Sequence, residues 1–227
     1  RETFKSYLKG ELEFLFIAPE RLAVPGFSEM LMGHPPSLIA VDEAHCISHW
    51  GHDFRPDYRL VGERLSGLKN TPIVALTATA TPLVQKDICN QLKLKNPTLF
   101  IHGFRRENLA IQLVDVLPSQ RGERILEVLS QSNRLPAIVY APTRKKAEEI
   151  SKELSKKLKT SAYHAGMPSE RRESVQSSFL QGDIDVIVAT VAFGMGIDKS
   201  NVRTVIHAAL PGSIESYYQE IGRAGRD

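Results

Sequence analysis

The chain has 227 residues, of which 42% are hydrophobic, so it can bury enough apolar surface for one large or two small domains. Its formal net charge of +3 permits a polyanionic partner but does not demand one. Its two cysteines, Cys46 and Cys89, form no CxxC motif, which argues against a disulfide scaffold and favours a cytoplasmic setting. No apolar run approaches the length that spans a bilayer, so we expect no membrane partner.

Short apolar runs alternate with amphipathic stretches along the chain. We expect strands at residues 14–17, 38–41, 73–76, 99–101, 137–140, 186–188 and 202–206. We expect helices at residues 3–9, 82–92, 121–131, 145–158 and 169–181, and one more that begins near Ser213. Continuous apolar strands are typical of parallel sheets that are covered on both faces. The alternation therefore predicts an α/β fold with parallel sheets.

Segment 102–119 interrupts this alternation, because it carries charges, Gly103 and Pro118 around a single alternating run at 109–114. We place a domain boundary within this segment. The predicted domains are residues 1–105 and residues 106–227, each an α/β unit.

Two carboxylates follow the predicted strand 38–41 directly, as Asp42 and Glu43. Ligand sites in open α/β sheets lie at the carboxyl ends of strands. In nucleotide hydrolysis, Asp42 at this place could hold Mg²⁺ while Glu43 positions and deprotonates the attacking water. The alternative is an ordinary acidic helix cap, since so short a motif also occurs by chance.

Hydroxyl groups follow the next strand, where Thr77 and Thr79 come directly after residues 73–76. Parallel strands end at the same edge of a sheet, so we expect both hydroxyls near the carboxylates. Small polar side chains at such a place can relay a conformational change from one binding site to another.

The last residues carry Gln219, Arg223 and Arg226 on or beside the final helix. Two arginines three residues apart would share one helical face. An arginine can neutralise the charge that develops on a transferring phosphoryl group, and we predict Arg226 in this role. The alternative is a solvated arginine-rich helix end, although Gly222 and Gly225 beside the arginines disfavour a plain helix.

An aromatic segment follows the carboxylates at residues 46–58. Trp50, Phe54 and Tyr58 recur at spacings of four, with His52 and Arg55 between them. Such a pattern offers ring faces for stacked bases beside a cation for the backbone. Packing in the core is the usual alternative for an aromatic stripe, but the interleaved charges would be costly to bury.

The same stretch crowds four side chains of zinc-binding types, His45, Cys46, His49 and His52. Ordinary zinc sites pair their ligands across a chain reversal, and the sequence contains no second cluster. We therefore expect no zinc site here.

Several motifs together resemble one family. DEAH at 42–45, TATAT at 77–81 and QxxGRxGR at 219–226 resemble the superfamily 2 helicases in type and in order. The segment CISHWGHDFRPDY at 46–58 resembles the aromatic-rich loop of RecQ helicases, except that His49 stands where glutamine is expected. Further matching segments are APERL at 18–22, YHAG at 163–166, VATVAFGMGIDK at 188–199 and GRAGRD at 222–227. The resemblance covers essentially the whole chain.

The resemblance implies two tandem RecA-like lobes, the first truncated at its N-terminus. It implies a motor that uses ATP and Mg²⁺ to move along single-stranded DNA and to unwind duplex or forked DNA with 3′-to-5′ polarity, in recombination and repair. Such a motor would work in the cytosol or nucleoid of a bacterium, or in the nucleus of a eukaryote. The sequence does not identify which proteins, if any, bind this chain.

The resemblance also implies two groups of site residues. Residues implied at the nucleotide are Asp42, which would also hold Mg²⁺, and Glu43, His45, Gly196, Asp198, Gln219, Arg223 and Arg226. Residues implied in binding DNA, or in coupling DNA binding to hydrolysis, are Trp50, His52, Phe54, Arg55, Thr77, Thr79, Thr143, Arg144 and Thr190.

The sequence contains no phosphate-binding loop of the form GxxxxGK[ST], which should precede DEAH. We therefore expect a fragment of the motor that hydrolyses little ATP by itself. The alternatives are a non-hydrolysing module that binds nucleic acid or protein, and an RNA motor of the same superfamily.

Overall fold

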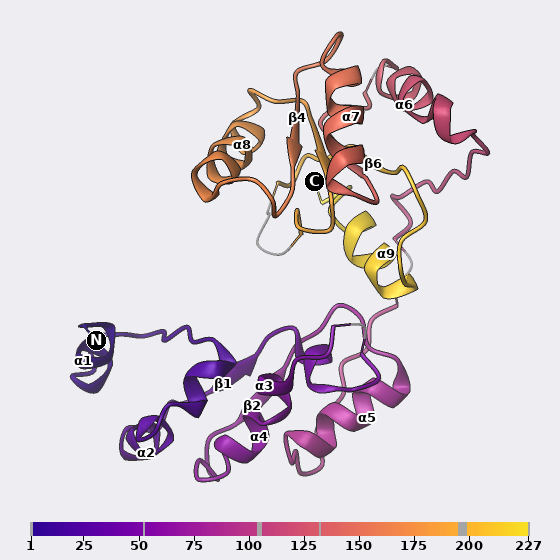
Figure 1. Ribbon diagram of the computed structural model, residues 1–227. Coiled ribbons are helices and arrows are strands. Elements are labelled where there is room, and N and C mark those ends of the chain that lie inside the picture. The colour runs from indigo at the N-terminus through magenta and orange to yellow at the C-terminus, as the bar shows by residue number, and fades with distance from the viewer. Residues whose placement is uncertain (1, 52, 104–105, 132, 195–198, 227) are drawn as a thin grey trace. The chain divides into compact units, whose positions relative to one another are not determined.

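The structure is a computed structural model that describes residues 2–51, 53–103, 106–131, 133–194 and 199–226 (Figure 1). It divides into two compact units, Arg1–Ile101 and His102–Asp227, which we describe one at a time. The division falls where the predicted boundary segment begins.

The first unit contains a parallel two-stranded sheet, in which β1 (Ile39–Val41) pairs with β2 (Ile73–Ala75) and Val41 lies opposite Ala75. Its helices are α1 (Glu2–Leu8), α2 (Phe27–Gly33), α3 (Pro56–Arg59), α4 (Val61–Arg64) and α5 (Pro82–Gln91), with 3-10 turns η1 (Pro19–Ala23) and η2 (Ala44–Ile47). Helix α5 begins where predicted because the signal is local: Thr81 Oγ1 accepts from Val84 N at 3.4 Å, and Pro82 follows the cap.

Two predicted strands of this unit are wrong. Residues 14–17 and 99–101 pair with no strand in the part of the chain that the structure describes, and the Phe16 side chain is 92% exposed. An apolar run becomes a strand only when a neighbouring strand takes its backbone hydrogen bonds.

The core of the first unit lies on one face of its sheet. Val41 packs there with residues of α2, α4 and α5, such as Leu31, Val61 and Ile88. The prediction of a sheet covered on both faces is wrong for this unit, because Leu38, Val74 and Leu76 are 55%, 38% and 48% exposed.

The second unit contains four parallel strands in the order β4-β5-β3-β6. They are β3 (Ala137–Tyr140), β4 (Thr160–Tyr163), β5 (Val186–Ala189) and β6 (Thr204–His207). Strand β4 was not predicted, because Thr160 and Ser161 interrupt any apolar run. Among the described residues, β4 lies at the edge of the sheet and pairs with β5.

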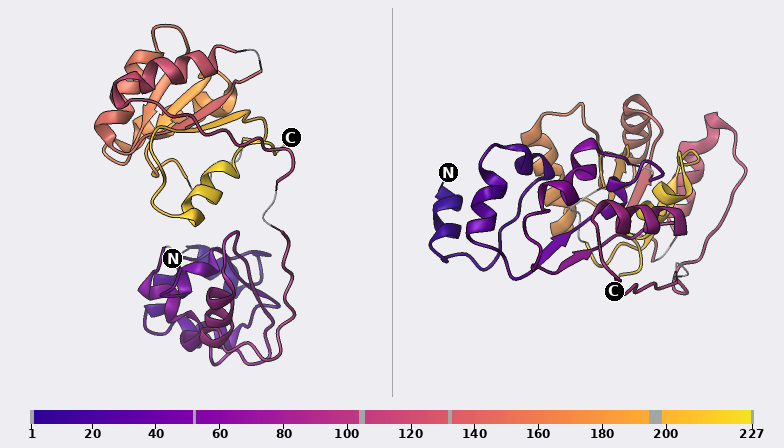
Figure 2. Two further views of the ribbon diagram at one scale, coloured as in Figure 1. Left: turned by 90° about the vertical axis from the view of Figure 1, so that its right-hand side faces the viewer. Right: turned by 90° about the horizontal axis from the view of Figure 1, so that it is seen from below.

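Helices cover both faces of this second sheet, as predicted. The covering helices are α6 (Arg121–Leu129), α7 (Arg144–Leu154) and α8 (Ser169–Gln181); the unit also contains α9 (Ile214–Ile221) and the 3-10 turn η3 (Pro118–Gln120). Ala137 and Val139 pack with α6 and α7, while the alternate residues Ile138 and Tyr140 pack with α8 on the opposite face (Figures 1 and 2). Each fully buried branched side chain stabilises the fold by roughly 1.5–3 kcal/mol.

The structure confirms the α/β class with parallel sheets. The alternating run 109–114 forms no strand, and its Ile111 and Leu113 are 72% and 88% exposed. Among the described residues, no helix has both the length and the apolar character that a membrane crossing requires.

Candidate functional site

The end of β1 carries the predicted carboxylates in a constrained backbone. Glu43 has φ 49° and ψ 41°, in the left-handed region that costs a non-glycine residue about 1–3 kcal/mol. The Asp42 carboxylate accepts from Glu43 N at 2.8 Å, and Ala44 N donates to Leu76 O at 2.9 Å. The ends of β1 and β2 are thus tied together, which fixes where both carboxylates lie.

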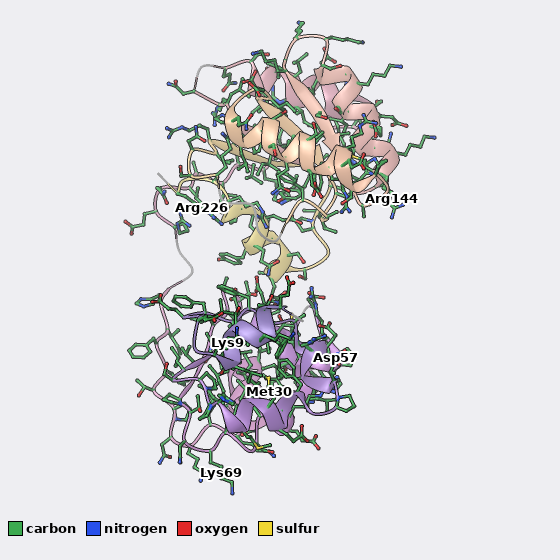
Figure 3. All side chains as sticks on the ribbon, turned by 90° about the vertical axis from the view of Figure 1, so that its left-hand side faces the viewer. Lys9, Met30, Asp57, Lys69, Arg144 and Arg226 are labelled. Atoms are coloured by element: carbon green, nitrogen blue, oxygen red, sulfur yellow. The ribbon has the colours of Figure 1, made fainter. Side chains whose placement is uncertain are left out.

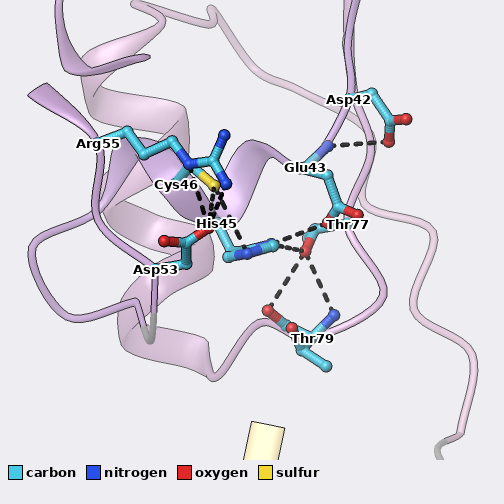
Figure 4. A network of polar contacts seen from close by, with 8 residues as sticks. All are labelled: Asp42, Glu43, His45, Cys46, Asp53, Arg55, Thr77 and Thr79. Carbon is cyan, nitrogen blue, oxygen red and sulfur yellow. Dashed lines mark hydrogen bonds and ion pairs between the residues drawn. The ribbon is translucent and has the colours of Figure 1, made fainter. Parts of the chain in front are cut away.

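His45 joins the carboxylates to the threonines. Its ring is 2% exposed, and its Nδ1 lies 3.0 Å from Thr77 Oγ1 and 3.3 Å from Glu43 Oε2 (Figure 4). Thr79 N donates to Thr77 Oγ1 at 3.2 Å. The buried Oγ1 of Thr79 itself has no hydrogen-bond partner among the described residues. The structure therefore brings Glu43, His45 and Thr77 together, while the Thr79 hydroxyl points elsewhere.

The other side of the His45 ring faces the loop that follows. Cys46 Sγ lies 3.6 Å from His45 Nε2 and donates to Asp53 Oδ2 at 3.8 Å. Burial, and to a smaller extent the charge of Asp53, raises the pKa of the Cys46 thiol to about 11. Arg55 donates to the same Asp53 oxygen from Nε at 3.1 Å and Nη2 at 2.7 Å, and this hydrogen bond raises the pKa of Arg55. A continuous set of polar contacts thus runs from Glu43 to Arg55.

The aromatic residues of the loop separate into different environments. Trp50 is 69% exposed, whereas Phe54 lies against His49 with ring centroids 3.9 Å apart. Tyr58 packs against the core from α3, and burial raises its pKa. The Tyr58 ring, placed by α3, therefore differs from the exposed Trp50 ring in what it can offer a base. His52 lies outside the described residues.

Asp87 on α5 binds the loop that follows β1 through hydrogen bonds, and the sequence did not predict this role. Its Oδ2 accepts from Ser48 Oγ and from Arg59 Nη1, both at 2.8 Å, and its Oδ1 accepts from Gln91 Nε2 at 3.3 Å. Burial alone would raise the pKa of Asp87, but the hydrogen bonds from these three side chains outweigh it and lower the pKa. A carboxylate among the apolar positions of an amphipathic helix was the signal available in the sequence.

In the second unit, predicted residues follow the ends of neighbouring parallel strands. Thr143 and Arg144 come after β3, and Thr190 comes after β5. Thr143 Oγ1 caps α7 by accepting from Lys146 N at 3.1 Å, and Arg144 is exposed at the start of that helix (Figure 3). These residues therefore share one sheet edge, with backbone N–H groups of a helix start beside an arginine.

The C-terminal arginines do not share a helical face, which corrects that prediction. Helix α9 ends at Ile221, and Gly225 adopts φ 60° while its N–H donates to Val202 O at 3.1 Å. Arg226 Nε turns back to donate to Gly222 O at 3.0 Å, and Arg226 is exposed (Figure 3). Glycine suits position 225 because the φ of 60° strains other residues, and a Cβ would also lie 2.7 Å from Asn108 Nδ2.

Arg223 lies inward instead. Its Nε is buried without a hydrogen-bond partner among the described residues. Burial raises the pKa of nearby Tyr140 to about 12, and the charge of Arg223 opposes that rise. Gln219 is half-buried on α9. Gly196 and Asp198, also predicted here, lie outside the described residues.

Comparisons with known proteins match both units. The family model of DEAD/DEAH box helicases matches residues 1–88, and that of the helicase conserved C-terminal domain matches residues 120–227. The RecQ ATP-dependent DNA helicase of Bacillus subtilis is 45% identical over 229 residues, covering 100% of this chain and 38% of that protein. The RecQ of Pasteurella multocida is 45% identical over 97% of this chain and 35% of its own length. The chain thus spans well under half the length of these relatives.

Solved structures show the same fold at low identity. The Mycobacterium smegmatis helicase Lhr, bound to single-stranded DNA and AMP-PNP, gives a TM-score of 0.63 at 22% identity, covering 99% of this chain and 29% of that one. Yeast Dbp5, bound to RNA and ADP BeF3, gives 0.64 at 21% identity, covering 89% of this chain and 55% of that one. These likenesses support tandem RecA-like units.

Proposed function

Because the chain belongs to the RecQ family of DNA helicases, we propose that its parent protein couples ATP hydrolysis to 3′-to-5′ movement along single-stranded DNA and unwinds duplex DNA, forked DNA included. The observation that carries the proposal is the set of contacts from Glu43 through His45 and Cys46 to Asp53 and Arg55. It connects a carboxylate suited to hydrolysis with a loop suited to DNA.

The carboxylate end fits a nucleotide with its magnesium ion. Asp42 and Glu43 offer hard oxygen ligands at a strand end, where Mg²⁺ is commonly held, and the strained backbone of Glu43 is typical of a functional site. Asp42 would hold the ion, which when bound supplies charge neutralisation to the phosphates. Glu43 would accept the proton of the attacking water, and His45 would keep its carboxylate in place from 3.3 Å.

The loop end fits a single strand of DNA. The exposed ring of Trp50 can stack on a base, which is worth roughly 1–3 kcal/mol, and Phe54 would add to that surface. Arg55 would contact a phosphate, and any shift of its guanidinium would reach His45 through Asp53 and Cys46. Binding of DNA would in this way alter the surroundings of Glu43.

The second unit would contribute contacts of two kinds. Thr143, Arg144 and Thr190 at its sheet edge would hold phosphates of the DNA backbone. Arg226 would neutralise charge on the transferring phosphoryl group, with Arg223 and Gln219 nearby in sequence.

The test is Glu43→Gln in the full-length protein. Loss of the general base should lower DNA-stimulated ATP hydrolysis by about 100-fold or more while DNA affinity stays unchanged, since the substitution keeps the side chain's shape. The matched control Glu29→Gln, at an exposed position of α2, should hydrolyse ATP normally. Normal turnover by Glu43→Gln would refute the assignment of the base.

A binding module without hydrolysis remains the second candidate, because the 227 residues contain no GxxxxGK[ST] loop. The 227-residue chain itself should then bind single-stranded DNA in a salt-dependent way without hydrolysing ATP. ATP turnover by this chain would exclude that candidate, and a comparison of DNA with RNA as activator of the full-length protein would exclude an RNA motor.

A further inference from the structure

Three side chains that can bind a metal ion converge on the loop side of the His45 ring (Figure 4). One ligand atom each from His45, Cys46 and Asp53 lies within 4.8 Å of the other two. Cys46 Sγ is 3.6 Å from His45 Nε2 and 3.8 Å from Asp53 Oδ2. In a tetrahedral site with bonds of about 2.3 Å to sulfur and about 2.0 Å to nitrogen, those two atoms lie about 3.5 Å apart. The observed separations are close to what one shared ion requires.

The chain reversal that the sequence did not reveal is present here. Arg55 N donates to Cys46 O at 3.0 Å, so the loop returns to its own beginning and brings Asp53 beside the adjacent pair of ligands. The candidate set considered from the sequence was different, because His49 packs against Phe54 instead. In the folded chain the third candidate ligand is therefore the Asp53 carboxylate and not His49.

The surroundings support ligands rather than isolated polar groups. A metal-bound histidine generally presents its second nitrogen to a carboxylate or another acceptor, which fixes its tautomer. His45 Nδ1 lies near Thr77 Oγ1 and Glu43 Oε2, at 3.0 Å and 3.3 Å. Arg55 likewise orients the Asp53 carboxylate by donating a hydrogen bond to it. The Asp53 side chain is 45% exposed, so an ion can reach the site from solvent.

We propose that His45 Nε2, Cys46 Sγ and the Asp53 carboxylate form a site for one thiophilic divalent cation such as zinc, with water in the fourth position. The thiol proton is released to solvent on binding, and no electron is transferred. Occupancy fixes the His45 ring with its N–H at Nδ1, directed at Thr77 and Glu43. On the basis of the function proposed above, this holds the general base in a hydrogen bond and slows ATP hydrolysis.

The ligand types select the ion. A thiolate and an imidazole favour zinc over magnesium, which prefers an octahedral shell of oxygens, so this site is chemically separate from the carboxylate of Asp42. The positive charge of Arg55 opposes the cation, and the described residues supply three protein ligands. We therefore expect binding weaker than that of a structural four-ligand zinc site.

Cobalt(II) is the probe, because a tetrahedral cobalt thiolate absorbs in the near ultraviolet and in the visible. The 227-residue chain should bind one equivalent with both absorptions, and zinc should abolish them by displacement. Cys46→Ser should lose the bands, whereas the matched variant Cys89→Ser, at the other cysteine, should keep them. Circular dichroism of each variant confirms that it is folded. Bands that are absent from the unaltered chain, or that persist in folded Cys46→Ser, would overturn the site.

The effect on hydrolysis is measured separately in the full-length protein. Relative to the zinc-free rate of the same protein, zinc at the concentration that displaces cobalt should slow ATP turnover several-fold in the unaltered protein and in Cys89→Ser, but not in Cys46→Ser. Equal inhibition of all three would refute the role of this site in hydrolysis while leaving the cobalt result intact. A full-length protein without any ATPase activity would instead refute the proposed function, and the cobalt experiment would still decide the site.

Discussion

The two units hold their predicted site residues by different means. In the first unit, side chains hold one another: His45 contacts Glu43 and Thr77, and Asp53 accepts from both Cys46 and Arg55. In the second unit, the backbone positions the predicted arginine: Gly225 turns the chain, and Arg226 donates to the carbonyl of Gly222. A substitution in the first network should therefore disturb several residues, whereas one at Arg226 should disturb little beyond its own charge.

The sheets differ as well. Both faces of the second sheet are covered, with Ile138, Ile187 and Val188 fully buried, whereas Val74 and Leu76 of the first unit remain exposed. The second unit therefore has the larger hydrophobic contribution to its stability, and the first depends more on its polar contacts.

The largest expected effect is on ATP hydrolysis, from removing the charge of Arg226 without disturbing the fold. Arg226→Ala should lower DNA-stimulated ATP hydrolysis in the full-length protein by about 1,000-fold or more, as the loss of an arginine finger does. Stability should change by less than about 0.5 kcal/mol, because the side chain is exposed. Arg171→Ala, at an exposed position of α8, is the control for activity; an equal loss there would contradict a specific role for Arg226.

The contrast in burial predicts the next effect. Phe179→Ala on α8 should destabilise the second unit by about 3–5 kcal/mol, because its fully buried ring contacts Phe193 and fills the core. Phe16→Ala, a 92% exposed phenylalanine of the first unit, should change stability by less than about 0.5 kcal/mol. Denaturant unfolding of each variant measures both; similar losses would mean that Phe16 is covered in solution.

The polar support of the first unit is tested at Asp87. Asp87→Asn should destabilise this unit by about 1–3 kcal/mol, because Ser48 and Arg59 lose a charged acceptor. The folded-state pKa of Asp87 is lowered, so its contribution is present above the unfolded pKa of about 3.9 and is lost as the pH falls through the folded value. Stability of the unaltered chain and of the variant should therefore converge in acid. Glu63→Gln, exposed on α4, serves as control, and a difference that persisted in acid would exclude the carboxylate as its source.

The smallest effect concerns one hydroxyl. Thr77→Val removes the partner of His45 Nδ1 at 3.0 Å, which should cost about 0.5–1.5 kcal/mol and reduce DNA-stimulated turnover roughly 2- to 10-fold. Thr160→Val replaces a buried hydroxyl that has no partner among the described residues, so it should be neutral or slightly stabilising. Turnover that is unchanged in Thr77→Val would remove this hydroxyl from the coupling proposal.

Several features could be predicted because the forces that create them are local. Thr81 and Pro82 mark the start of α5 by capping, and α8 ends at Gly182, whose φ of 90° suits glycine. Continuous apolar runs predicted β3 and β5, since strands buried on both faces have no polar side to show. The position of Asp42 and Glu43 at a strand end followed from the same pattern.

Other features depended on partners distant in sequence. Strand β4 has a polar start and forms because β5 pairs with it, whereas the apolar run 14–17 pairs with no described strand and stays irregular. The support from Asp87 to Ser48 joins residues 39 positions apart, which no local pattern indicates.

The sequence by itself therefore determined the fold class, the family and the strand end that carries the carboxylates, because hydrophobic periodicity and short motifs record local preferences. Only the tertiary structure decided that Asp53 meets His45 and Cys46, and that beyond the end of α9 the Nε of Arg223 is buried while Arg226 donates back to Gly222 O. Both results depend on chain reversals, whose hydrogen bonds join residues that sequence spacing does not relate.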